Sequence, residues 1–165
     1  MNQSTTHLEL ALQTAMQSCM DDIVHAANVD AALLDGSEME KNQIRNVLNV
    51  AEESRSLAVV ANFIRYQMGR SQTGLAWRHV RGEKVFGLRI IEQIESPQGV
   101  VAQQTEAALA HARKRVGDVP QEAAQSLRYD LARYYLGYLN RAFYYGRETK
   151  KWDDLRQAGK EAEYV

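Results

Sequence analysis

Two arginines stand beside a tyrosine and a glutamine in the segment FIRYQMGR, residues 63–70. Arg65 and Arg70 place guanidinium groups at the end of a helical pattern, where a core helix needs only a cap and a turn. Guanidinium groups bind phosphate through paired hydrogen bonds and also stack on flat rings. The segment therefore predicts a surface that binds a negatively charged partner.

Charge is distributed unevenly along the chain, although its net value is only -1. Residues 1–40 contain seven Asp or Glu and no Lys or Arg, whereas residues 55–89 contain seven Lys or Arg and one acid. This asymmetry favours one face for a polyanion and another for basic neighbours. It adds four candidate binding residues, namely Arg55, Arg78, Arg81 and Lys84. Arginines scattered singly over a solvated surface are the alternative.

A second polar stripe follows the last long helical pattern, residues 120–146 and just beyond. Its members recur at i, i+4, i+7, i+11 and i+14, and they are Arg133, Gly137, Asn140, Tyr144 and Arg147. Arginines suit phosphates and exposed rings suit bases, so the stripe indicates a nucleic-acid backbone. A polar face that is merely solvated explains the same pattern equally well.

Catalytic and metal-binding patterns are missing from the sequence. The four histidines are dispersed, and no HExxH, CxxC or Glu-x-x-His pair occurs. No glycine-rich phosphate loop follows a strand. Adjacent carboxylates such as Asp21 and Asp22 point about 100° apart on a helix, unlike a catalytic pair. We therefore expect no catalytic residues, no metal site and no cofactor, and the chain is not expected to be an enzyme.

The elements that position these side chains are helices. Apolar residues recur at helical spacing nearly throughout, which predicts an all-α bundle of about five to six helices in a single domain, residues 1–165. The capping-box pattern Thr6-x-x-Glu9 predicts an acidic N-terminal helix within residues 1–36, ending at Gly36. A second pattern, Ser37-x-x-Glu40, predicts the start of the next helix. A third helix follows the polar interruption at residues 52–56.

The second half of the chain predicts a loop, two helices and a long helix. Residues 71–84 have no sustained period and are expected to form the loop, and residues 85–96 are expected to be helical. Ser96-Pro97 predicts the start of a helix that runs to Gly117. A long central helix then spans residues 120–146, with residues 147–165 as a charged tail that forms a short helix or frays. The expected core face of the long helix comprises Leu127, Leu131, Tyr134, Tyr138, Ala142 and Tyr145, and it is widened by Tyr135, Leu139 and Phe143.

The N-terminus lacks the basic and apolar regions of a secretory signal, and no apolar run reaches the length of a membrane span. The one cysteine, Cys19, excludes an internal disulfide and is expected to be a buried, inert thiol. A cytoplasmic protein that does not contact a membrane is therefore expected.

Three blocks, in order, resemble a known family. NQIRNVLN (residues 42–49) opens a helix, FIRYQMGR (residues 63–70) closes the next, and LRYDLARYYLGYLNRAFYYG (residues 127–146) forms a tyrosine-rich helix. Together they look like the small helical subunit of type III CRISPR–Cas effector complexes, in the Csm-type branch. The resemblance covers roughly residues 40–146. The chain departs from it at Lys41-Asn42, where the family commonly has Thr-Ser, and in the loop around Trp77 and the segment 95–120.

The resemblance implies a non-catalytic structural subunit in antiviral defence. Several copies would stack head to tail as a minor filament beside backbone subunits that carry the guide RNA, and would line the groove in which guide and target RNA pair. The large subunit is a further implied partner. Carried over by motif, Arg45, Arg65 and Arg70 are the first candidates for RNA contact, and Gln43 is expected to cap its helix.

Two alternatives from other classes remain open at this point. One is a helical protein–protein adaptor whose arginines meet acidic partners and that makes no nucleic-acid contact. The other is a DNA-binding regulator, although no compact helix-turn-helix pattern occurs.

Overall fold

Helices make up most of residues 3–158, the part of the chain that the computed structural model describes. The predicted all-α fold is confirmed. The only strands in these residues form a short hairpin, β1 (Val80–Arg81) and β2 (Lys84–Val85). The helical elements are α1 (Gln3–Ser18), α2 (Met20–Ala31), the 3-10 turn η1 (Ala32–Leu34), α3 (Lys41–Ser54), α4 (Leu57–Gly69), α5 (Phe86–Glu95), α6 (Val100–Val116), α7 (Gln121–Thr149) and α8 (Trp152–Gln157).

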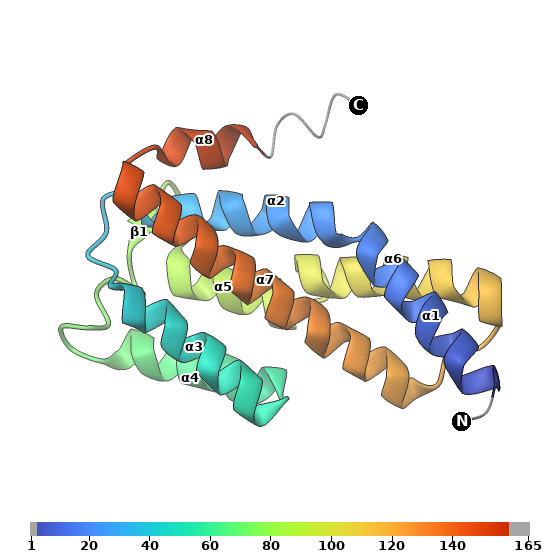
Figure 1. Cartoon of the computed structure of the whole chain (residues 1–165). Coiled ribbons are helices and arrows are strands. Elements are labelled where there is room, and N and C mark those ends of the chain that lie inside the picture. The colour runs from blue at the N-terminus through green and yellow to red at the C-terminus, as the bar shows by residue number, and fades with distance from the viewer. Residues whose placement is uncertain (1–2, 159–165) are drawn as a thin grey trace.

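The long helix α7 is the centre of the bundle, as predicted. It packs against α1, α2, α3, α6 and α8, and Figure 1 shows it crossing the molecule between α2 on one side and α3 and α4 on the other. Its buried side chains include Leu131, Tyr135, Leu139 and Phe143, which meet apolar residues of the surrounding helices. Burying such side chains stabilises the fold by about 1.5–3 kcal/mol each.

The expected N-terminal helix is broken into α1 and α2 at Cys19 (Figure 1). The Ser18 hydroxyl donates to the carbonyl of Ala15 at 2.6 Å, and the Cys19 amide bonds back only three residues, to Met16 at 3.1 Å. Such local bonds compete with the helical ladder and bend it. The bend lets α1 pack on α6 while α2 packs on α7. Cys19 is buried as predicted, and burial raises the pKa of its thiol.

The caps of the first two predicted helices differ from expectation. Thr6 lies inside α1 and does not cap it. Likewise α3 begins at Lys41 rather than after Ser37, because Gln43 Oε1 accepts the Glu40 amide at 2.8 Å. Gln43 therefore caps its helix, as predicted. After α3, Arg55 adopts a left-handed conformation (φ 49°) and Ser56 caps α4.

The predicted loop of residues 71–84 contains turns and most of the β1–β2 hairpin, and it buries the side chain of Trp77. The helix predicted for residues 85–96 is confirmed as α5. The predicted helix start at Ser96-Pro97 is wrong, because Ser96 ends α5 and α6 begins only at Val100. There the Val100 amide donates to Gln93 Oε1 at 2.9 Å, and this side chain from α5 takes the place of the expected serine cap.

The predicted core face of α7 is partly wrong. Tyr134 and Tyr145 are 44% and 40% exposed, and Tyr138 is half-buried. Compared with the predicted core face, the buried face of α7 is shifted around the helix toward Tyr135, Leu139 and Phe143. Tyrosine tolerates this placement because its ring is apolar while its hydroxyl is polar.

The helix α7 also extends past residue 146, to Thr149. Part of the predicted tail forms α8, whose Trp152 packs against Gly146. Residues 159–165 of that tail lie outside the described residues.

Candidate nucleic-acid interface

One side of α7 carries tyrosines and an arginine in a row, which we call the α7 stripe: Tyr134, Tyr138, Arg141 and Tyr145. Their spacing of i, i+4, i+7 and i+11 places them on one helical face. The rings of Tyr134 and Tyr138 lie nearly parallel, with centroids 6.2 Å apart and an interplanar angle of 21°. Arg141 lies beside them, its Cζ atom 5.6 Å from the centroid of the Tyr138 ring. The stripe therefore combines an aromatic platform with a positive charge.

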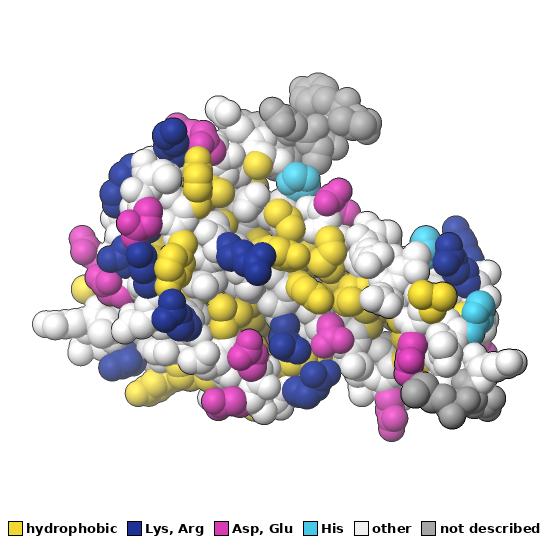
Figure 2. Space-filling model, in the orientation of Figure 1, with side chains coloured by type: hydrophobic (Ala, Val, Ile, Leu, Met, Phe, Trp, Pro, Cys, Tyr) yellow, Lys and Arg dark blue, Asp and Glu magenta, His cyan; other side chains and the backbone are white. Residues whose placement is uncertain are grey.

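Beside the α7 stripe lies a groove of about 530 Å³ between α1, α3 and α7. Figure 2 shows hydrophobic side chains gathered at the centre of this face, over the middle of α7, with Lys and Arg side chains nearby. The apolar lining of the groove comes from Met16, Leu48 and Ala51 together with the two stacked tyrosines, Tyr134 and Tyr138. Gly137 also lines it, and a Cβ atom placed there would meet nothing within 4 Å. A side chain at this position would therefore begin in open space at the groove.

Charged and polar groups surround the same groove. Arg133 reaches Asp130 at 4.0 Å, the outer limit of an ion pair, and Asp130 also lies 3.6 Å from Arg55. Arg141 forms no ion pair with any described residue. Asn140 lines the groove as well, and its buried Oδ1 has no hydrogen-bond partner within residues 3–158. Arg133 and Arg141 are therefore weakly engaged by the protein itself.

The seam between α3 and the end of α7 brings Arg45, Tyr144 and Arg147 together. Arg45 donates a hydrogen bond to the Tyr144 hydroxyl, and Lys41 Nζ lies 4.9 Å from the centroid of the same ring. Arg147 donates to the carbonyl of Met39 at 2.9 Å and pairs with Glu40 at 3.0 Å. Arg147 thus joins α7 to the start of α3, while Arg45 remains exposed at the seam.

The arginines of FIRYQMGR lie on the surface of α4 and at its end. Arg65 pairs with Glu95 at 3.1 Å, and its side chain remains 55% exposed. The guanidinium group of Arg70 donates a hydrogen bond to Gln67 Oε1 at 3.3 Å, and its Cζ atom lies 5.9 Å from the centroid of the Tyr66 ring. Exposed ion pairs are worth about 0–1 kcal/mol, so both guanidinium groups remain available to another partner.

The arginines of the 71–84 segment are held by the protein. Arg78 donates to three backbone carbonyls at the end of α4, those of Met68, Arg70 (3.0 Å) and Ser71 (3.3 Å). It therefore satisfies carbonyls that the end of the helix leaves unpaired.

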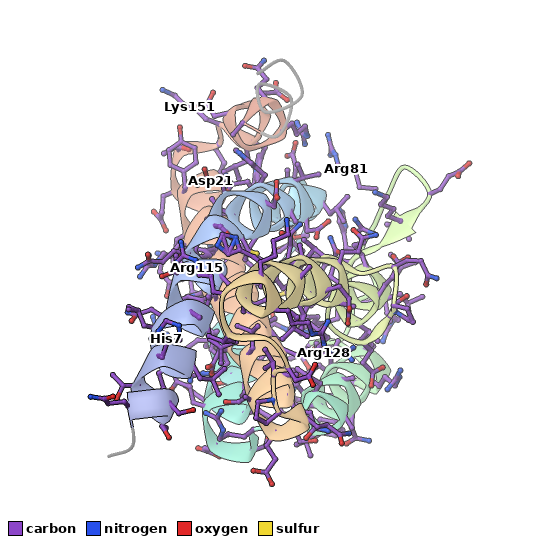
Figure 3. The ribbon with its side chains drawn as sticks, turned by 90° about the vertical axis from the view of Figure 1, so that its right-hand side faces the viewer. His7, Asp21, Arg81, Arg115, Arg128 and Lys151 are labelled. Carbon is purple, nitrogen blue, oxygen red and sulfur yellow. The ribbon has the colours of Figure 1, made fainter. Side chains whose placement is uncertain are left out.

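The hairpin carries the last two predicted binding residues. Arg81 pairs with Asp35 at 3.2 Å, and Figure 3 shows it where the hairpin approaches α2. Arg156 of α8 holds the same carboxylate at 2.7 Å. Lys84 on β2 is exposed and forms no ion pair within the described residues. Two of the three basic residues in this segment are thus committed to internal contacts.

The predicted binding residues do not form one surface. Arg133, Arg55 and the unpredicted Arg141 lie along α7 and the end of α3, Arg45 and Arg147 lie at the seam, and Arg65 and Arg70 lie on α4. Sequence reasoning missed the α7 stripe because it assigned the tyrosines to the core. The i, i+4, i+7 spacing of two tyrosines and an arginine, in a helix already rich in buried residues, was the signal that could have revealed it.

A buried polar network at Asp30 was also missed. Asp30 is 0% exposed, and its carboxylate accepts hydrogen bonds from Arg89 Nε (3.0 Å), Gln93 Nε2 (2.7 Å) and the Tyr135 hydroxyl (2.7 Å). Burial lowers the pKa of Arg89, but the charge and hydrogen bond of Asp30 outweigh it and shift the pKa upward. Burial and the same carboxylate raise the pKa of Tyr135 well above its ordinary value. The network joins α2, α5 and α7 and leaves the charge on Asp30 fully paired.

The chain matches no known protein-family model, no curated protein and no solved structure. None of the helices within residues 3–158 is both long and apolar enough to cross a membrane. In the same residues, no three His, Cys, Asp or Glu side chains gather in a group that could hold a metal ion. What the chain does must therefore be inferred from the chemistry of its own surface.

Proposed function

We propose that this chain is a non-catalytic, RNA-binding subunit of a multiprotein complex, of the kind that it resembles in type III CRISPR–Cas effectors. The observation that carries the proposal is the α7 stripe with its adjoining groove. Rings that are at least partly exposed and weakly paired arginines on one helix are the features that bind single-stranded nucleic acid without sequence preference. Arg133 and Arg141 supply the charge, and Tyr134 and Tyr138 supply the stacking surface.

In this role, copies of the chain stack beside the backbone subunits in the cytoplasm and face the guide and target RNA. The exposed arginines of α4, Arg65 and Arg70, form a second contact with the RNA or with a neighbouring subunit. Exposed acids in the N-terminal helices, among them Asp21 and Asp22, suit the basic surface of the next copy. The complex acts in antiviral defence, and the chemical steps belong to other subunits.

Titration of the purified full chain with a fluorescent single-stranded RNA tests the proposal. Wild-type protein is expected to bind at low salt and to lose affinity as salt rises, because phosphate contacts release counterions. Arg133→Glu combined with Arg141→Glu should weaken binding at least about tenfold, since it replaces two attractive contacts with repulsive ones.

Arg113→Glu combined with Arg115→Glu provides the matched control. Both residues are exposed in the last turn of α6 and form no ion pair within the described residues, and the control changes net charge by the same amount. Equal losses in the two variants would show that only net charge matters and would refute the α7 site. Wild-type protein that binds no RNA at low salt, alone or with the complex, would refute the proposed function.

A second candidate function, a helical adaptor without nucleic-acid contact, is favoured by a different surface. Val59 and Tyr66 on α4 are 46% and 60% exposed, and they line a shallow groove with Val50 and Phe63. Exposed apolar side chains that cluster are typical of protein-binding sites. In a reconstituted complex, Val59→Asp would then prevent assembly, while the α7 variant would assemble normally and capture RNA as well as the wild type.

A further inference from the structure

The groove beside α7 is concave, and its lining combines apolar side chains with the charged side chains of Glu52, Asp130, Arg133 and Arg141. Its volume of about 530 Å³ lies within the range of about 300–1,000 Å³ typical of small-molecule sites. Apolar side chains from α1 and α3 form one wall, and the stacked rings of Tyr134 and Tyr138 form another. A flat, largely apolar group such as a nucleobase fits this combination.

Along the axis of α7, one arginine position precedes the two rings and the other follows them. Arg133 precedes Tyr134 and Arg141 follows Tyr138, so eight residues separate the two guanidinium-bearing positions. At 1.5 Å per residue this is about 12 Å along the helix axis. A base that stacks on the rings would therefore have a guanidinium group on each side of it, where the phosphates before and after that nucleotide lie.

We propose that this groove holds one unpaired base of an RNA strand, stacked on Tyr134 and Tyr138, with the flanking phosphates on Arg133 and Arg141. The inference rests on the proposed function and makes it specific. A base within a duplex is stacked on both faces and paired at its edge, so it cannot enter the groove. The chain therefore distinguishes an unpaired nucleotide from a duplex, which would contact only the arginines at the rim.

Gly137 offers the cleanest test, because it lies in the groove and has open space where a side chain would begin. Gly137→Leu fills the groove, and leucine favours a helix more than glycine does, so the variant should remain folded. A short single-stranded RNA with one central 2-aminopurine is the probe, and the same strand annealed to its complement is the comparison. Binding is followed by anisotropy and by quenching of the 2-aminopurine emission.

We expect Gly137→Leu to lower affinity for the single strand about 5- to 150-fold, the value of one stacked base, and to abolish the quenching. Duplex binding should be unchanged. Tyr138→Ala should have a similar effect and Tyr138→Phe should not, because phenylalanine keeps the ring. If Gly137→Leu binds and quenches the single strand like the wild type, the base site is refuted.

Two further measurements distinguish the base site from the more general proposed function and from a site for free nucleotides. If Arg133→Glu with Arg141→Glu lowers the affinity for single-stranded RNA while Gly137→Leu does not, the proposed function is supported and the base site is refuted. Adenosine monophosphate is expected to bind far more weakly than the strand, because it lacks one flanking phosphate. If it binds as tightly as the strand, the groove is a mononucleotide site and the inference is wrong.

Discussion

Arg78 and Arg141 are both exposed arginines, yet the protein's own backbone occupies only the first. Arg78 donates to three carbonyls at the end of α4, whereas Arg141 lies over a tyrosine ring and pairs with no acid among residues 3–158. The same contrast holds more widely. Arg81 and Arg89 are held by Asp35 and Asp30, while Arg133 on α7 has only a distant partner.

The contrast shows that the basic segment of a sequence need not be its binding surface. In residues 71–89, Arg78, Arg81 and Arg89 connect the loop, the hairpin and α5 to the rest of the protein through hydrogen bonds and ion pairs. A guanidinium group that caps a helix cannot bind phosphate with the same N–H groups without uncapping it. Substitutions can therefore separate two roles of arginine. Replacing an arginine of residues 71–89 should lower the stability of the protein, and replacing one on α7 should lower its affinity for RNA.

Among the arginines that the protein itself holds, Arg89 has the most buried partner, and the largest expected effect on stability comes from removing that partner, Asp30. Asp30→Ala leaves Arg89, Gln93 and Tyr135 without their shared acceptor, and removing one partner of a buried ion pair costs about 3–5 kcal/mol. Urea unfolding followed by circular dichroism measures this loss. Glu106→Ala, at an exposed acid without an ion pair in the described residues, is the control and should change stability by less than about 0.5 kcal/mol. If Asp30→Ala lowered the free energy of unfolding by less than about 1 kcal/mol, the network at Asp30 would not stabilise the fold as proposed.

Arg78→Ala is the next test of the contrast. It removes hydrogen bonds from a charged donor to the carbonyls that end α4, and we expect a loss of about 1.5–3 kcal/mol. Affinity for RNA should not change, because this guanidinium group is already occupied. A variant of normal stability that binds RNA poorly would reverse the assignment and place Arg78 among the binding residues.

Two glycines of α7 should respond in opposite directions. Gly146→Ala places a methyl group against the Trp152 ring and must displace α8, so we expect a loss of about 1–3 kcal/mol. Gly137→Ala meets open space, and alanine's better helix propensity should raise stability by about 0.5–1 kcal/mol. Thermal unfolding of the two variants compares them directly. A loss at Gly137 would show that the groove is closed in solution.

The smallest expected effect on stability is at Arg65 and Arg70 in FIRYQMGR. Arg65→Ala with Arg70→Ala breaks one exposed ion pair and should lower stability by less than about 1 kcal/mol. In the assembled complex the double variant Arg65→Glu with Arg70→Glu should reduce capture of target RNA several-fold. Unchanged capture would remove α4 from the RNA-binding surface and leave α7 alone.

Much of the fold follows from local patterns in the sequence. Helical periodicity, Gly117 and Pro120 were sufficient to place the end of α6 and the start of α7, and the polar interruption at residues 52–56 separated α3 from α4. Two of the errors concern helix caps, where one side chain replaced another. Glu40 and Gln43 took the place of Ser37, and Gln93 from a neighbouring helix capped α6 in place of Ser96. The Gln93 cap depends on a contact between two helices, whereas the Glu40–Gln43 pair is local and was overlooked.

The candidate site was harder to predict. Sequence reasoning found Arg133, Gly137 and Asn140 on one polar stripe, and all three line the groove. It placed Tyr134 and Tyr138 in the core, because an aromatic residue at helical spacing is usually buried. Tertiary packing decides which side of a helix with so wide an apolar arc is covered. The ion pair of Arg81 with Asp35 joins segments distant in sequence, and the bonds of Arg78 to backbone carbonyls depend on how the chain turns after α4, so no local pattern reveals either.

The salt dependence of RNA binding tests most directly whether α7 carries the binding arginines. The logarithm of affinity for a single strand falls with the logarithm of salt concentration with a slope of about -0.7 per phosphate contact. Arg133→Ala with Arg141→Ala should therefore make the slope shallower by about 1.4. Arg78→Ala should leave it unchanged. A slope that changes for Arg78→Ala and not for the α7 pair would contradict this assignment of the RNA-binding surface.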